Sequence, residues 1–162
     1  AGFQPALKSA GRSMSGQIEN LPHETLAMAN PIQVQSLDHV TLVVKDLDRS
    51  RQFYVDGLGM REVPRPAFSF PGLWFQAGPT LIHLIGEHLG GSPAGNPLAE
   101  EFRTTRSNHF AFLVDDVEAA YDRAQELGMK IVSPPKARPD GFVQVFLNDP
   151  DGFVVELCSP AK

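Results

Sequence analysis

At 162 residues, with 42% hydrophobic and 20% charged side chains, the chain has the composition of a soluble globular protein with room for one ordinary domain. Its net charge of −5 and its scattered basic residues argue against binding to nucleic acids or anionic membranes, and no apolar run approaches the roughly 20 residues that span a bilayer. The single cysteine, Cys158, excludes an intramolecular disulfide and a cysteine-based zinc site, and favours a reducing, cytoplasmic location.

Residues 1–36 mix Ser, Gly, Gln and Pro without a sustained period, so we expect an N-terminal arm, natural or introduced by cloning, with no assigned function. The first β-branched run predicts a strand over 37–44. Asp46 then begins a helix that ends near Gly57, because an acidic residue favours the positive end of a helix. Three strands follow, over 60–65, 70–77 and 80–86, the last two separated by the turn Gly78-Pro79.

The second half of the chain has the same order of elements. A linker rich in Gly, Pro and Ser, residues 87–106, precedes it. We expect a strand over 108–114, a helix from Asp116 to about Leu127, a strand over 130–132, a Pro-rich loop over 133–141, and strands over 142–148 and 153–159 around the turn 149–152.

An internal repeat explains this order. The segment 37–46 returns as 107–116, and each copy reaches Leu-Gly-Met after its helix, at 58–60 and 127–129. The sequence therefore predicts an α+β fold of two tandem βαβββ modules within one domain. That domain covers residues 37–159, with module one at 37–86 and module two at 107–159.

The repeat also duplicates side chains that can bind a metal. His39 and His109 open the two modules, and the closing strands carry His83 and Glu156. Strand alternation sets His39, His109 and Glu156 on the face away from the bulkiest apolar residues, whereas His83 has apolar neighbours on both sides and is not placed by this argument. A carboxylate within an apolar strand needs a metal ion or an Arg or Lys partner. We interpret the four residues as one shared metal site.

These features resemble the vicinal oxygen chelate superfamily, which includes glyoxalase I, extradiol dioxygenases, fosfomycin-resistance enzymes and bleomycin-binding proteins. The paired modules, their opening histidines, the repeated Leu-Gly-Met and the sequence 148–153 leading to Glu156 carry the resemblance. It implies a curved mixed-sheet half-barrel around a divalent metal ion, and a homodimer whose site is shared between chains. The ligand positions of the family fall on His39, His83, His109 and Glu156.

The resemblance further implies a metal-dependent lyase or isomerase of glyoxalase type, acting on a small α-oxygenated carbonyl compound. Four protein ligands leave two positions on an octahedral ion, enough to chelate two adjacent oxygens. Glu156 matches the family's catalytic carboxylate, which moves a proton between carbons. His83 stands where glyoxalase I commonly has a second glutamate, so Glu156 and His83 are the candidate catalytic residues. The ligand set suits Zn, Ni, Co, Fe or Mn.

Two alternatives stay open: an extradiol-type Fe(II) dioxygenase and a non-enzymatic antibiotic-binding protein. Glutathione dependence is doubtful, because lactoylglutathione lyase usually has Arg and Asn where this chain has Val43 and Glu87. Loop cations could replace those contacts, although ordinary solvated surface is the better interpretation of each; they are Arg65, Arg103, Arg106, Lys136 and Arg138.

Overall fold

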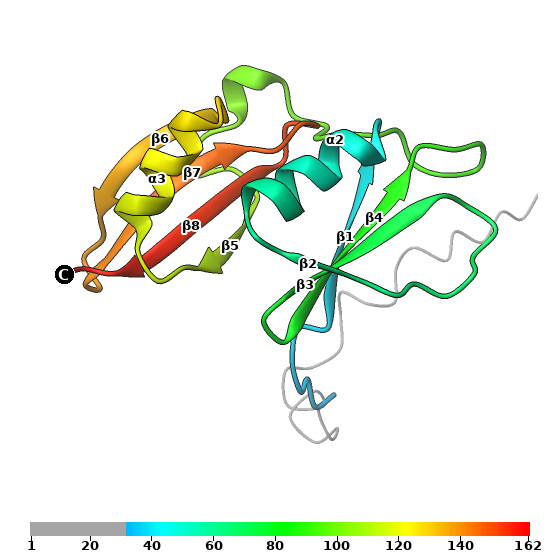
Figure 1. Cartoon of the computed structure of the whole chain (residues 1–162), viewed down its shortest axis with the longest axis horizontal. Helices are drawn as coiled ribbons and strands as arrows, with labels where there is room; N and C mark the ends of the chain where they lie inside the picture. Colours follow the sequence, from blue (N-terminus) through cyan, green and yellow to red (C-terminus); the bar gives the residue numbers. More distant parts are fainter. Residues whose placement is uncertain (1–31) are drawn as a thin grey trace, which may run out of the picture. The chain divides into compact units, whose positions relative to one another are not determined.

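The computed structural model describes residues 32–162, of which residues 37–162 form one compact unit. Most of the expected N-terminal arm lies outside the described residues. This unit contains the helices and strands discussed below (Figure 1). Within residues 32–162, no helix is long and apolar enough to cross a membrane.

Module one is a four-stranded mixed sheet with one helical segment. Its sheet has the order β1-β4-β3-β2, in which β1 and β4 are parallel and the other pairs are antiparallel. The elements are β1 (His39–Val44), helix α2 (Leu47–Arg51) with its π-helical continuation η1 (Gln52–Gly57), β2 (Arg61–Val63), β3 (Gly72–Ala77) and β4 (Thr80–Gly86).

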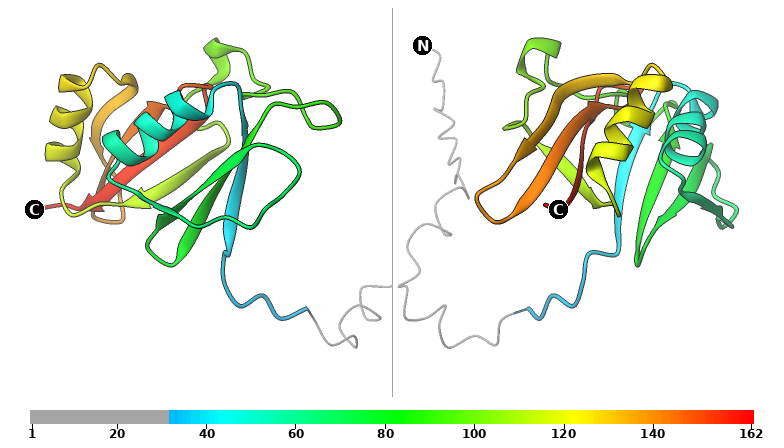
Figure 2. Two further views of the ribbon diagram at one scale, coloured as in Figure 1. Left: turned by 45° about the vertical axis from the view of Figure 1, so that its right-hand side comes forward. Right: turned by 60° about the vertical axis from the view of Figure 1, so that its left-hand side comes forward.

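Module two repeats this arrangement. Its sheet has the order β5-β8-β7-β6, with β5 and β8 parallel and the other pairs antiparallel. The two sheets and their helices are visible from two directions in Figure 2. The prediction of tandem βαβββ modules is therefore confirmed. The elements are β5 (His109–Leu113), α3 (Val117–Glu126), β6 (Lys130–Ala137), β7 (Phe142–Asn148) and β8 (Val154–Pro160), with a 3₁₀ turn η2 (Glu100–Phe102) in the linker.

Local chemistry explains why the two copies fold alike. Asp46 caps α2 by accepting hydrogen bonds from the backbone N–H groups two and three residues later, and Asp116 caps α3 in the same way. The glycines of the two Leu-Gly-Met sequences, Gly59 and Gly128, have φ of 71° and 65°, the left-handed conformation that ends a helix without steric cost. Each copy therefore encodes its own helix start and stop.

The structure differs from the sequence prediction at the Pro-rich segment. Residues 133–137, expected as part of a loop, belong to strand β6. Two register shifts, on either side of Ser133, let the strand include Pro134 and Pro135. β6 is the edge strand of its sheet and has no neighbouring strand on its outer side. The prolines, which lack N–H groups, therefore remove no hydrogen bonds there.

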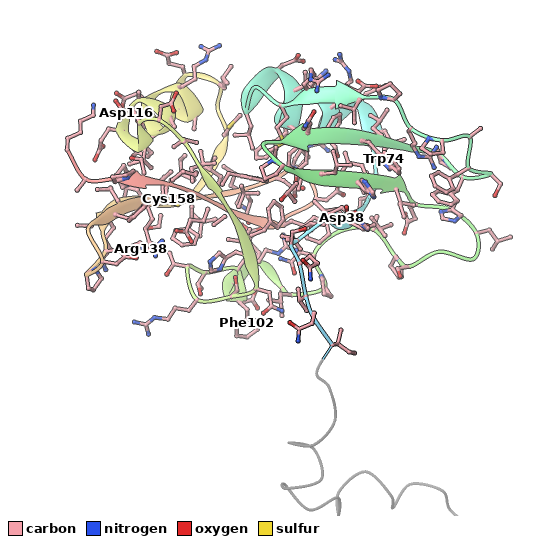
Figure 3. The ribbon with its side chains drawn as sticks, turned by 90° about the horizontal axis from the view of Figure 1, so that it is seen from below. Asp38, Trp74, Phe102, Asp116, Arg138 and Cys158 are labelled. Atoms are coloured by element: carbon pink, nitrogen blue, oxygen red, sulfur yellow. The ribbon has the colours of Figure 1, made fainter. Side chains whose placement is uncertain are left out.

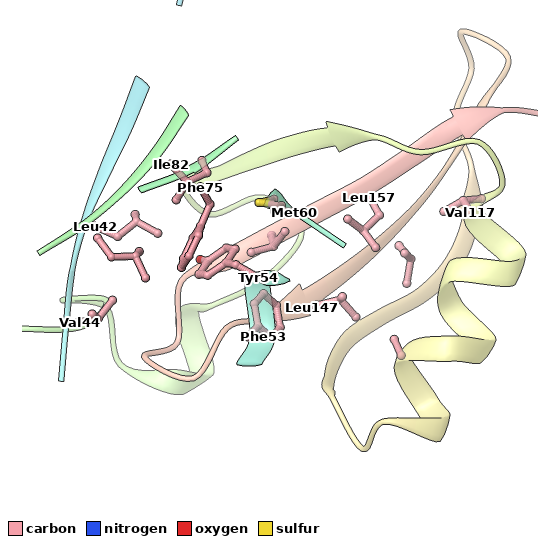
Figure 4. Packing of buried hydrophobic residues seen from close by; sticks show 14 residues of the cluster. Leu42, Val44, Phe53, Tyr54, Met60, Phe75, Ile82, Val117, Leu147 and Leu157 are labelled. Atoms are coloured by element: carbon pink, nitrogen blue, oxygen red, sulfur yellow. The ribbon is translucent and has the colours of Figure 1, made fainter. Parts of the chain in front are cut away.

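One hydrophobic core runs through both modules (Figure 4). The fully buried side chains of Tyr54 and Phe75 in module one belong to the same cluster as Leu147 and Val155 in module two. Within this core the Tyr54 hydroxyl donates a hydrogen bond of 2.8 Å to Asp149 Oδ2. Burial raises the pKa of Asp149 to about 6. Apolar packing and one buried polar contact therefore hold the modules together.

Candidate functional site

Strand register places the four candidate ligands at equivalent positions. His83 on β4 lies opposite Thr41 on β1, two residues beyond His39. Glu156 on β8 lies opposite Ala111 on β5, likewise two residues beyond His109. Because cross-strand partners share a face, His83 lies on the face of His39, which alternation alone did not decide. Each sheet thus carries one pair of metal-capable side chains on one face.

The pair in module one is an aromatic stack. The rings of His39 and His83 lie 4.1 Å apart at 16°, and Trp74 covers the other side of His83 at 4.0 Å and 5°. His39 Nδ1 lies 2.7 Å from Asp38 Oδ2, so the carboxylate orients the ring and leaves Nε2 as the outward nitrogen. Figure 3 labels Asp38 and Trp74 at this end of the molecule.

His83 has a nitrogen without a partner. Its Nε2 is buried and makes no hydrogen bond. Burial is the main cause that lowers the pKa of His83, and the neighbouring His39 acts in the same direction. The ring is therefore a neutral imidazole at neutral pH, the form in which histidine binds metals.

The pair in module two is charged. His109 Nε2 lies 3.1 Å from Glu156 Oε2, and Glu156 has only 5% of its side chain exposed. His109 Nδ1 lies 2.8 Å from the carbonyl oxygen of Ser107, which can only accept, so Nδ1 carries a hydrogen. In a neutral ring, Nε2 would then turn a lone pair toward the carboxylate. A cation between these two atoms, a proton or a metal ion, removes that repulsion.

Glu156 also has a basic partner. Arg138 Nη1 lies 3.0 Å from Glu156 Oε1, and Arg138 Nη2 lies 2.5 Å from Asp140 Oδ2. The interpretation of Arg138 as ordinary solvated surface is therefore wrong. An Arg-Pro sequence occurs at the same place in both modules, at 65–66 and 138–139, and this repeat could have revealed the residue.

The two pairs do not form one cluster within a single chain. Among residues 32–162, no three His, Cys, Asp or Glu side chains come together in a way that could hold a metal ion. Each pair lies on its own sheet, His39 with His83 and His109 with Glu156. The carboxylate of Glu87 accepts from the backbone N–H of Ala94 at 3.0 Å and so caps its own loop.

The residues nevertheless suit a divalent metal. The unpartnered Nε2 of His83 and the Nε2 of His109 facing a carboxylate are atoms that a cation would satisfy. Asp38 and the Ser107 carbonyl fix the other nitrogens of His39 and His109, as the outer partners of metal-bound histidines do. Imidazole and carboxylate together are ligands for Zn, Ni, Co, Fe or Mn.

Two tandem βαβββ modules with metal-capable side chains at one repeated register position define the vicinal oxygen chelate architecture. Residues 36–157 match the Glyoxalase/Bleomycin resistance protein/Dioxygenase superfamily, and the chain belongs to it.

Similar proteins agree with this assignment. "Glyoxylase I 4" of Arabidopsis thaliana is 30% identical over 80% of this chain and 74% of its own length. "Probable lactoylglutathione lyase" of Synechocystis sp. is 28% identical over 76% and 95%. A fosfomycin resistance protein FosX mutant from Listeria monocytogenes, solved with Mn(II) and 1S,2S-dihydroxypropylphosphonic acid, has a TM-score of 0.61, 20% identity and coverage of 80% and 95%, which shows the shared fold alone.

Proposed function

We propose that this protein is a metal-dependent lyase or isomerase of glyoxalase type that moves a proton within a small α-oxygenated carbonyl substrate. The observation that carries the proposal is the register equivalence of the two pairs, His39 with His83 and His109 with Glu156. The unpartnered Nε2 of His83 supports a cation at this position. The similarity to "Glyoxylase I 4" supports the reaction class.

The proposed site belongs to a homodimer. Since neither pair alone supplies four ligands, module one of one chain would face module two of a second copy. Each dimer would then contain two equivalent sites. Val43 is apolar and Glu87 is negatively charged, so neither can bind the carboxylate groups of glutathione. We therefore propose another thiol or a thiol-free substrate.

A divalent metal ion held by the four candidate ligands would supply Lewis acidity. Glu156 takes a proton from the carbon beside the substrate carbonyl and returns it to the neighbouring carbon. His109 and Arg138 hold the carboxylate of Glu156 in place. His83 is neutral and packed between His39 and Trp74, so it holds its position without adding negative charge.

The first test measures metal affinity on protein purified without a tag or added metal. Calorimetric titration with Zn(II), Ni(II), Co(II), Fe(II) and Mn(II) should give one ion per chain. Replacement of each of the four residues by Ala should weaken binding by roughly tenfold or more. His88→Ala is the matched control, because His88 is a linker histidine just after β4 whose ring nitrogen contacts the Gly86 carbonyl. Wild-type affinity in the His83→Ala variant would contradict the four-ligand site.

The second test measures proton transfer directly. The metal-loaded protein is incubated in D₂O with α-hydroxycarbonyl compounds and with hemithioacetals of methylglyoxal, and NMR follows deuterium at the carbon beside the carbonyl. We expect exchange that Glu156→Gln removes. Catechol-dependent oxygen uptake by the iron form would instead identify a dioxygenase. Metal-free protein that binds bleomycin tightly would identify a binding protein.

A further inference from the structure

The two Arg-Pro sequences occupy equivalent places in the two modules. Arg65 follows β2, and Arg138 follows β6, which is the corresponding strand of its sheet. The repeat therefore duplicates a cation as well as the candidate ligands.

Arg138 lies on the same face as Glu156. Its backbone N–H donates 2.7 Å to the Phe142 carbonyl, so Arg138 lies across the hairpin from Phe142. Phe142 and Phe146 lie on the same face of β7, because side chains four residues apart in a strand point the same way. Phe146 pairs with Glu156 on β8. The guanidinium lies 5.7 Å from the Phe142 ring and 3.0 Å from Glu156, with a third of the side chain exposed. It can therefore reach a molecule bound at Glu156.

Arg65 is connected to the other pair through aromatic rings. Its guanidinium lies 4.7 Å from the ring of Phe68 and 4.9 Å from that of Phe70, and it donates to the Phe70 carbonyl at 2.9 Å. Phe68 lies 6.2 Å from Trp74, which stacks on His83. Among residues 32–162, no carboxylate comes within ion-pair distance of Arg65.

The two cations differ in the negative charge around them. Arg138 pairs with Asp140 and with Glu156, which it shares with His109, and a third of its side chain stays exposed. Within residues 32–162, Arg65 contacts a carbonyl oxygen and two aromatic rings but no carboxylate. Although the net charge of the chain is −5, both candidate half-sites are thus flanked by guanidinium groups. Guanidinium binds carboxylate and phosphate through two parallel hydrogen bonds.

We propose that Arg138 and Arg65 bind oxyanion groups of the substrate, so that the α-oxygenated carbonyl compound carries at least one carboxylate or phosphate group. The inference rests on the proposed function, because the shared dimeric site would bring Arg65 of one protomer and Arg138 of its partner to the same substrate. Arg138 takes the group nearest the reacting carbon, since it touches Glu156. Arg65 takes a second, more distant group.

Matched metal-chelating probes test this proposal. Acetohydroxamate, succinate monohydroxamate and its phosphonate analogue share one chelating group, which carries a methyl group, a carboxyethyl chain and a phosphonoethyl chain respectively. The dimeric protein is loaded with Co(II), whose visible spectrum reports chelation, and calorimetry gives the affinities. We expect the anionic probes to bind about tenfold tighter than acetohydroxamate, the usual gain from a charge-assisted contact. The anionic probe that binds more tightly shows whether the site prefers a carboxylate or a phosphate group on the substrate.

The variants separate this role from a structural one. Arg138→Gln should bring the affinity ratio of the probes close to one, Arg65→Gln should lower it less, and Arg138→Lys should retain part of it. In Arg65→Gln the cobalt spectrum and the affinity for acetohydroxamate should stay within about twofold of wild type, because neither depends on the proposed anion contact. Arg138 also holds Glu156, so its variants are compared by the ratio of the probe affinities within each variant, from which a change at the metal cancels. Arg123→Gln is the matched control, because Arg123 is exposed on α3 and pairs there with Glu126 at 2.8 Å.

Two failures are distinguishable. Equal binding of all three probes by the wild type, or an anion preference that survives both Gln variants, would overturn this inference and leave the proposed function intact. No change of the cobalt spectrum with any hydroxamate would overturn the proposed function and, with it, the inference that rests on it.

Discussion

The two modules share the same strand arrangement and differ in the side chains at their equivalent positions. At the same register position, module one has His83 between two aromatic rings, and module two has Glu156 between His109 and Arg138. Stacking holds the ring of His83, whereas ion pairs hold the carboxylate of Glu156. Duplication therefore preserves the register, and the side chains at the equivalent position differ in chemistry.

This division suggests how a duplicated fold gains a reaction. The histidine in module one has a pKa lowered mainly by burial, so it is suited to hold a cation without taking a proton. The carboxylate in module two is fixed by His109 and Arg138, so it is suited to accept a proton at a defined place. Two identical half-sites would lack one of these functions.

The largest expected effect comes from making the charged half neutral. Glu156→Gln keeps the shape and an oxygen for Arg138 but removes the proton acceptor. We expect deuterium exchange into substrate to fall by about 10²–10⁴-fold, the usual contribution of a general base. His83→Gln, at the equivalent position, should weaken metal binding while exchange at saturating metal falls much less. Equal loss of exchange in both variants would show that the two halves do not divide the roles.

A mixture of two inactive variants tests whether the halves meet across a dimer. His39→Ala damages module one, and Glu156→Ala damages module two. Refolded together, half of the dimers are mixed and each mixed dimer has one intact site, so activity should return to about a quarter of wild type. The control mixes His109→Ala with Glu156→Ala, both in module two, and should remain inactive. Recovery in neither mixture would show that each site lies within one chain.

The sequence predicted the parts of the molecule that are encoded locally and repeated. Asp46 and Asp116, with the two Leu-Gly-Met sequences, define the helix boundaries through capping and backbone conformation, and the alternation of β1 matches its burial. β6 was predicted too short, because its two prolines are tolerated only through register shifts at a sheet edge. Edge position is a property of the assembled sheet.

The sequence proposes the residues of the candidate site, and the structure adds their contacts. The repeat identified His39, His83, His109 and Glu156, whereas the Arg138–Glu156 ion pair depends on a side chain folding back across a hairpin. Likewise, the face of His83 required the pairing of β1 with β4, which lies beyond any single strand.

The buried contact between the modules predicts a pH dependence of stability. Asp149 accepts from the Tyr54 hydroxyl, and burial raises its pKa from 3.8 to about 6. A raised pKa in the folded state means that this carboxyl stabilises the fold most below pH 4, and that the stabilisation is lost as pH rises through 6. The loss amounts to at most about 3 kcal/mol.

Urea unfolding at several pH values checks this contribution. The difference in unfolding free energy between the wild type and Asp149→Asn should decrease as pH rises from 4 to 7, since the amide does not titrate. Asp122→Asn, on the exposed side of α3, is the control and should give a difference that stays flat. A flat difference for Asp149→Asn would mean that its hydrogen bonds offset its burial.

The smallest expected effect compares the two arginines as neighbours of a bound metal. Arg138 touches Glu156 directly and competes with a metal for the same carboxylate, so Arg138→Gln should tighten metal binding by on the order of tenfold. Arg65 reaches His83 only through aromatic rings, and Arg65→Gln should change the affinity by roughly twofold. Calorimetric titration with Co(II) at two ionic strengths measures both. Salt should reduce the Arg65 effect more, because that charge acts at longer range. Equal effects of the two variants would contradict the distinction between a carboxylate held by ion pairs and an imidazole held by stacking.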